Sequence, residues 1–119
     1  MFLRKLNLNN FRNISKVDFD FNKNINIFIG NNAQGKTNIL ESIYFLAITR
    51  SHRTHNELNL IKNNELCTKI SCTFSNDNND IHMLSILLNK DGKKVSVDNI
   101  MQKKISNYLS RLNVIMFCP

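Results

Sequence analysis

The sequence has 119 residues, of which 42% are hydrophobic, and this predicts one domain with a modest core. Its formal net charge of +7 and pI of about 9.6 favour polyanionic partners such as nucleic acid, nucleotide phosphates or anionic membrane, although a composition rich in Asn, Lys and Ile explains the same charge equally well. No apolar run is long enough to cross a bilayer and the N-terminus lacks the pattern of a signal peptide, so we expect a cytoplasmic protein without a membrane partner.

Three strands are predicted before the first helix. Apolar and polar residues alternate in the segment 2–11, and again over 16–21, where Val17, Phe19 and Phe21 share one face. The short apolar run "INIFI" at 25–29 is typical of a buried strand. A loop at 30–37 follows, and the apolar stretch after it predicts a helix that ends near Ile48.

The second half of the chain predicts mainly strands. The polar stretch 49–65 is expected to be a loop with one short turn at 58–61. Strands are predicted at 66–74, 81–89 and 94–98, with a tight hairpin turn that carries Asp91 and Gly92. Helical spacing of apolar residues predicts a helix over 100–112, and "NVIMF" at 113–117 is a last strand candidate. The fold class is therefore α/β, with an antiparallel region over residues of about 65–98.

The segment "GNNAQGKT" matches the phosphate-loop pattern G-x-x-x-x-G-K-[ST]. Glycine lets the backbone approach phosphates closely, and the loop directs backbone N–H groups towards an anion at a helix N-terminus. Lys36 supplies a positive charge for the β- and γ-phosphates, and the Thr37 hydroxyl suits Mg²⁺. A strand before the loop and a helix after it are the context that the motif requires. The predicted binding residues are Gly30, Asn31, Asn32, Ala33, Gln34, Gly35, Lys36 and Thr37.

Three segments resemble the N-terminal region of the RecF family, SMC-like ATPases of the ABC type that act in bacterial recombinational repair. These segments are "LNLNNFRNISKVDFDF", "NINIFIGNNAQGKTNILESIYFLA" and "SHRTHNELNLI". The sequence departs from the family pattern at Ser42, where alanine is usual, and at Thr49, where the family has glycine. The end of the chain, "NVIMFCP", is similar to a V-x-F-x-P segment of the family.

The resemblance implies that residues 1–119 are the N-terminal part of one ATP-binding head domain, with ATP and Mg²⁺ as cofactors. It also implies an ATP-dependent DNA-binding protein of DNA replication, recombinational repair and the SOS response. Such a protein binds single-stranded or gapped DNA, helps to load recombinase with recombination-mediator proteins, and dimerises with ATP. Arg12 and Asn13, in "FRN", match a family position near the nucleotide, whereas a surface arginine after a strand explains Arg12 equally well.

The acidic Walker B strand and the ABC signature motif of the family are not found in this sequence. Hydrolysis needs a group that orients water, and in this family also a signature motif from a second protomer. We therefore expect no catalytic residue within this chain and little ATPase activity from it alone.

Other polar residues are weaker candidates. Arg50 and Arg53 lie in a basic stretch after the helix, and a solvated loop explains them slightly better than a contact with nucleotide or DNA. Glu41 matches a family position but is equally well an ordinary helix residue. His52 and His55 lack further zinc ligands.

The basic pairs Lys93–Lys94 and Lys103–Lys104 are interpreted first as solvated surface and second as a DNA-facing patch. The cysteines, interpreted as reduced thiols, are Cys67, Cys72 and Cys118.

Two alternative functions remain open at this level. A phosphate-loop small-molecule kinase would share the loop, but no acidic or arginine-rich lid is evident, and a GTPase would need an N-K-x-D motif that is absent. The second alternative is a basic nucleic-acid-binding module with an accidental motif match, and Mg²⁺-dependent nucleotide binding would exclude it.

Overall fold

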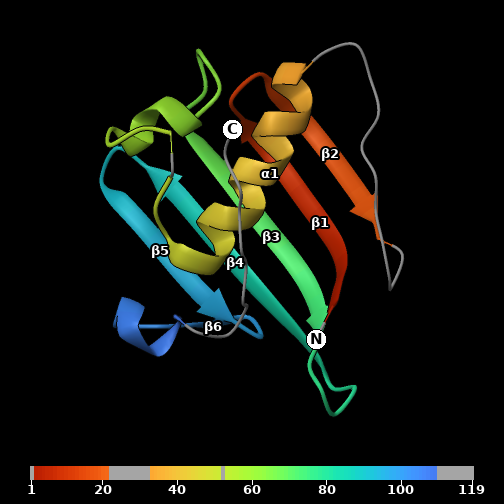
Figure 1. Ribbon diagram of the computed structural model, residues 1–119. Coiled ribbons are helices and arrows are strands. Elements are labelled where there is room, and N and C mark those ends of the chain that lie inside the picture. The colour runs from red at the N-terminus through yellow and green to blue at the C-terminus, as the bar shows by residue number, and fades with distance from the viewer. Residues whose placement is uncertain (1, 22–32, 52, 110–119) are drawn as a thin grey trace.

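The computed structural model describes residues 2–21, 33–51 and 53–109, with residues 33–36 described by their backbone (Figure 1). The elements, in chain order, are β1 (Phe2–Phe11), β2 (Ile14–Asp20), α1 (Ala33–Ile48), the 3-10 helix η1 (Glu57–Leu60), β3 (Cys67–Ser75), β4 (Ile81–Asn89), β5 (Gly92–Val97), β6 (Ile100–Met101) and the 3-10 helix η2 (Ile105–Asn107).

The described strands form one antiparallel sheet with the order β2-β1-β3-β4-β5-β6. Hairpins join β1 to β2, β3 to β4, β4 to β5 and β5 to β6, whereas β1 pairs with β3 across α1 and its following loop. Helix α1 crosses one face of this sheet, over β1, β3 and β4 (Figure 1). We call this the inner face, and the opposite side the outer face.

The core fills the space between α1 and the inner face. Strand alternation directs every second side chain inward, so Leu8, Ile70, Ile86 and Val95 form a row of register partners across four strands. Helix α1 contributes Phe45, which is fully buried, and burial of such a side chain stabilises the fold by about 1.5–3 kcal/mol. The remaining buried apolar side chains are Leu6, Phe11, Ile39, Leu46, Ala47, Leu60, Cys72, Phe74, Leu84, Leu88 and Tyr108.

Most of the predicted elements are confirmed, and two boundaries differ. The antiparallel region extends beyond residues 65–98, because β1 and β2 belong to the same sheet. Helix α1 begins at Ala33, so the last positions of the predicted loop are already helical. The short turn predicted at 58–61 is confirmed as η1. The strands predicted at 25–29 and 113–117 lie outside the described residues.

The helix predicted over 100–112 is wrong in its described part. Asp98 and Asn99 both have positive φ angles, 52° and 66°, and form a tight turn that returns the chain as β6. Aspartate and asparagine tolerate this conformation better than other residues, which favours a two-residue hairpin. Only one 3-10 turn, η2, follows among the residues described up to Leu109, and there Tyr108 buries its ring and donates a hydrogen bond to the Leu46 carbonyl of α1.

Among the described residues, no helix is both long and apolar enough to span a membrane.

Candidate nucleotide-binding site

The N-terminal turn of α1 is the structural basis of the candidate site. The helix has 16 residues, and its first turn contains no acidic side chain. The backbone N–H groups of a first helical turn have no acceptor within the helix, and together with the helix dipole they favour an anion at this end. Thr37 lies in this part of the helix and is half-buried. Of the other predicted loop residues, Gly30, Asn31 and Asn32 lie outside the described residues, and the backbone of Ala33, Gln34, Gly35 and Lys36 is helical.

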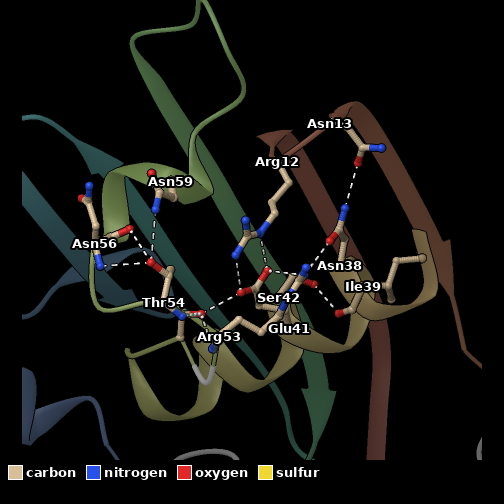
Figure 2. A network of polar contacts seen from close by, with 11 residues as sticks. Arg12, Asn13, Asn38, Ile39, Glu41, Ser42, Arg53, Thr54, Asn56 and Asn59 are labelled. Atoms are coloured by element: carbon tan, nitrogen blue, oxygen red, sulfur yellow. Dashed lines mark hydrogen bonds and ion pairs between the residues drawn. The ribbon is translucent and has the colours of Figure 1, made fainter. Parts of the chain in front are cut away.

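Glu41 lies one turn after Thr37 and is the centre of a polar network (Figure 2). Its side chain has no exposed surface, and Arg12 binds it through two hydrogen bonds, Nε to Oε1 at 2.7 Å and Nη2 to Oε2 at 2.9 Å. Ser51 donates a third hydrogen bond to Oε2 at 2.6 Å. Arg53 Nη1 lies 3.3 Å from Oε1. The carboxylate therefore holds two arginines and a hydroxyl from two separate segments, the β1–β2 hairpin and the loop after α1.

The charge of Glu41 is stabilised despite its burial. Burial by itself raises the pKa of a carboxyl group, but the hydrogen bonds from Arg12 and Ser51 and the charges of Arg12 and Arg53 outweigh it. The pKa of Glu41 is therefore lower than its ordinary value. The hydrogen bond to Glu41 also raises the pKa of Arg12, against the opposing effect of burial. Both groups are charged at neutral pH.

Asn38 extends the network towards the β1–β2 hairpin. Its Nδ2 donates to Asn13 Oδ1 at 2.8 Å, and its Oδ1 accepts a hydrogen bond from Arg53 Nη1 at 2.7 Å (Figure 2). Asn38 and Glu41 are three residues apart and so lie on the same side of α1. Arg53 bridges both of them. One face of the helix thus fixes the two arginines and Asn13.

Arg12 has a strained backbone. It occupies the first position of the two-residue hairpin loop between β1 and β2, with φ of 54°. The left-handed conformation costs an ordinary L-residue about 1–2 kcal/mol. Its N–H donates to the Leu60 carbonyl at 2.8 Å, and its side chain binds Glu41, so the surrounding contacts offset the strain. Strain of this kind is often found at functional sites.

A polar recess of about 370 Å³ opens beside these residues. Arg12, Arg53 and Lys62 supply three cationic groups, and the carboxylate of Glu41 compensates part of the charge of the two arginines. The amides of Asn13 and Asn38 line the same space. A recess of this composition favours a polar anion over an apolar ligand.

The structure thus brings together several residues that sequence reasoning placed apart. Arg12, Asn13 and Arg53 lie together, and Glu41 is their buried anchor rather than an ordinary helix residue. Arg50 and His55 are exposed, and His52 lies outside the described residues. Sequence reasoning missed Asn38 and Ser51, although the spacing of Asn38 and Glu41 could have indicated one shared face of the helix. Among the described residues no group of three or more His, Cys, Asp or Glu side chains could hold a metal ion.

Comparisons with known proteins identify the family to which the chain belongs. Residues 1–116 match the family model of the AAA ATPase domain, and the chain belongs to this family. The more specific resemblance to the N-terminal part of RecF is also confirmed. The DNA replication and repair proteins RecF of Lactobacillus acidophilus and Enterococcus faecalis are each 48% identical to it over all 119 residues. The chain spans about a third of the length of these relatives, 32% in both cases.

Solved structures show the same fold. The recombination mediator protein RecF-ATPrS in the RecFOR pathway matches with a TM-score of 0.91 and 28% identity, over 99% of this chain and 32% of that one. RecF-ATP in the same pathway matches with a TM-score of 0.92 and 27% identity, over 99% of this chain and 33% of that one. The predicted fold class, the N-terminal lobe of such an ATPase with an antiparallel subregion, is confirmed.

Proposed function

We propose that this chain forms the nucleotide-binding part of an ATP-dependent DNA-binding protein of replication, recombinational repair and the SOS response. The observation that carries the proposal is the buried carboxylate of Glu41, which fixes Arg12 and Arg53 beside the phosphate-loop helix. Two arginines held by one buried anion are preorganised, so they lose little conformational freedom when an anionic ligand binds. The RecF relatives support an assignment to DNA replication and repair.

Within this function, residues 30–37 would hold the phosphates of ATP. The start of α1 provides an electropositive end without a competing acidic side chain. Lys36 would neutralise the β- and γ-phosphates, and Thr37 would supply one oxygen ligand to Mg²⁺, which polarises the phosphates when it is bound. Arg12 and Asn13 would approach the nucleotide from the β1–β2 hairpin, since both line the recess next to α1.

The phosphate loop and its polar network would bind ATP, and the chemical step would depend on further groups. We infer that an acidic water-orienting residue and a second protomer complete the site, so the protein forms an ATP-dependent homodimer. Hydrolysis would then separate the two heads. We infer further that the protein acts in the cytoplasm on single-stranded or gapped DNA, where it aids recombinase loading together with recombination-mediator proteins.

Binding of a fluorescent ATP analogue at fixed Mg²⁺ tests the nucleotide part of the proposal in the intact protein. Lys36→Ala removes a charge-assisted contact worth about 1.5–3 kcal/mol, so we expect the dissociation constant to rise at least about tenfold. Lys103→Ala, at an exposed position outside the site, is the matched control and should bind as the wild type does. Equal dissociation constants for both variants would contradict the assignment of Lys36.

A DNA-binding titration with and without a non-hydrolysable ATP analogue tests the second part. If nucleotide joins two heads, one DNA molecule meets two basic surfaces, and both the affinity and its salt dependence should increase. Equal affinities and equal salt slopes in the two states would remove ATP-switched DNA binding and favour the phosphate-loop kinase.

A further inference from the structure

The outer face of the sheet carries a row of exposed lysines. Register partners across five strands place Lys16 of β2, Lys69 of β3 and Lys94 of β5 in one line, with Asn9 and Leu87 between them. We call Lys16, Lys69 and Lys94 the lysine row. All three side chains are exposed. Neighbouring strands lie about 4.8 Å apart, so successive lysines of the row are about 10 Å apart.

Strand alternation produces this arrangement and divides a pair of adjacent lysines. Lys93 points to the inner face, where its ammonium lies 5.5 Å from the centre of the Phe45 ring. Lys94, the next residue, therefore points to the outer face. The basic pair 93–94 is thus not one solvated patch: one lysine is largely buried under α1 and the other belongs to the row.

The line next to the row carries small polar side chains. Ser71, Ser85 and Ser96 are register partners in the adjacent line of the outer face, and Asn7 continues that line on β1. Small hydroxyl side chains leave the backbone of the sheet close to the surface. A broad, extended partner could therefore lie across β3, β4 and β5 without steric hindrance from large side chains in this line.

The charge of the outer face is positive and is centred on β3 to β5. Lys69 and Lys94 form no ion pair among the described residues. Among the described strands, the carboxylates on this face are Asp18 and Asp20 of the edge strand β2, where Lys16 is 4.0 Å from Asp18 and Lys5 is 3.9 Å from Asp20. Exposed pairs at such distances contribute little and leave the lysines free to exchange partners.

We propose that the lysine row binds the phosphodiester backbone of DNA, and this inference rests on the proposed function. A line of exposed ammonium groups beside a line of small polar side chains is complementary to a regular line of phosphates, and lysine–phosphate contacts release counterions. Lysine ammonium groups bind phosphates as point charges and have no planar fork for bases, so the three lysines contribute affinity and position rather than sequence recognition.

The test compares two triple variants of the intact protein that change the net charge equally. Lys16→Gln/Lys69→Gln/Lys94→Gln removes the row, and Lys90→Gln/Lys103→Gln/Lys104→Gln removes three exposed lysines elsewhere. Binding of labelled single-stranded and gapped DNA is measured by fluorescence anisotropy at several salt concentrations with the ATP analogue present. Affinity for the ATP analogue, measured separately, checks that both variants are folded.

We expect the row variant to lose at least about tenfold in DNA affinity near 0.1 M salt and to show a salt slope less steep by about 2 to 3. The control should lose much less. Equal losses of DNA affinity in the two variants would overturn the inference while wild-type ATP binding stands. It would also be overturned if the row variant lost binding to phosphatidylserine vesicles but kept its DNA affinity. If the wild type binds ATP but no DNA, the DNA part of the proposed function fails, and the inference fails with it.

Discussion

Arg12 and Glu41 are joined by two hydrogen bonds, at 2.7 Å and 2.9 Å, although 29 positions separate them in the chain. The contact links the tip of the β1–β2 hairpin to the middle of the phosphate-loop helix (Figure 2). Because Ser51 and Arg53 bind the same carboxylate, the loop after α1 is held at the same point. Any movement of α1 would therefore be transmitted to both segments.

Glu41→Gln should strongly destabilise the fold. The side chain is fully buried, and its loss of charge leaves Arg12 and Arg53 without their counterion. Removal of one partner from a buried ion pair costs about 3–5 kcal/mol. The measurement is urea unfolding at neutral pH. Glu65→Gln changes the same chemical group at an exposed position and should remain within about 0.5 kcal/mol of the wild type. Similar values for the two variants would contradict the role of Glu41.

The same carboxylate should give the fold a specific pH dependence. The pKa of Glu41 is lower in the folded state than its ordinary value of 4.5, so the unfolded chain takes up the proton more readily. The stabilisation is then fully present above pH 4.5 and is lost as the pH falls through the folded-state pKa. The free energy of unfolding of the wild type should therefore approach that of Glu41→Gln in acid. If the free energies of unfolding of the two proteins fell in parallel from pH 6 into acid, Glu41 would be excluded as the source of this pH dependence.

The sequence predicted the local elements well because alternation and the phosphate-loop motif are short-range signals. Alternation over 16–21 predicted β2, and the motif with the apolar stretch after it predicted α1. The pairing of β1 with β3 could not be predicted this way, since it joins residues such as Leu6 and Cys72 that are distant in the chain. The turn at Asp98 and Asn99 was missed because the apolar residues after it are spaced as in an amphipathic helix.

The candidate site shows the same limit. Its loop residues were predicted from one contiguous motif, whereas its polar network was not. A buried glutamate is uncommon unless it is paired, and nothing local distinguishes Glu41 from a solvated helix residue until Arg12 and Ser51 are brought beside it. Strand alternation places Lys93 and Lys94 on opposite faces only because β5 begins at Gly92, whereas the predicted strand began at Lys94.

Lys93→Met should loosen the loop that follows α1. The Lys93 ammonium donates to the Thr49 carbonyl and to Glu57 Oε1 at 2.6 Å, so one side chain holds both ends of residues 49–57. Only 16% of its side chain is exposed, and charged hydrogen bonds of this kind contribute about 1.5–3 kcal/mol. We expect a loss of about 2 kcal/mol in the free energy of unfolding and faster amide hydrogen exchange of Arg53 and Thr54.

Lys94→Met is the control for this loop, because the neighbouring lysine is exposed on the outer face. Its stability should change by less than about 0.5 kcal/mol, and amide exchange in residues 49–57 should stay as in the wild type. Exchange that is equally fast in both variants would show that Lys93 does not hold the loop.

The last prediction separates the two arginines that the sequence places in one basic stretch. Arg53 binds Glu41 and Asn38 and lines the recess beside α1, whereas Arg50 is exposed and is not among the residues that line this recess. If the recess receives part of the nucleotide, Arg53→Ala should raise the dissociation constant of Mg-ATP about tenfold, which corresponds to about 1.4 kcal/mol, and Arg50→Ala should leave it unchanged.

Binding is measured by titration of a fluorescent ATP analogue well below the melting temperature of each variant, so that a loss of stability is not mistaken for a loss of affinity. Arg53→Lys keeps the charge but not the planar fork that contacts both partners, and it should recover only part of the affinity. Full affinity in Arg53→Ala would limit Arg53 to a structural role in holding the loop against α1.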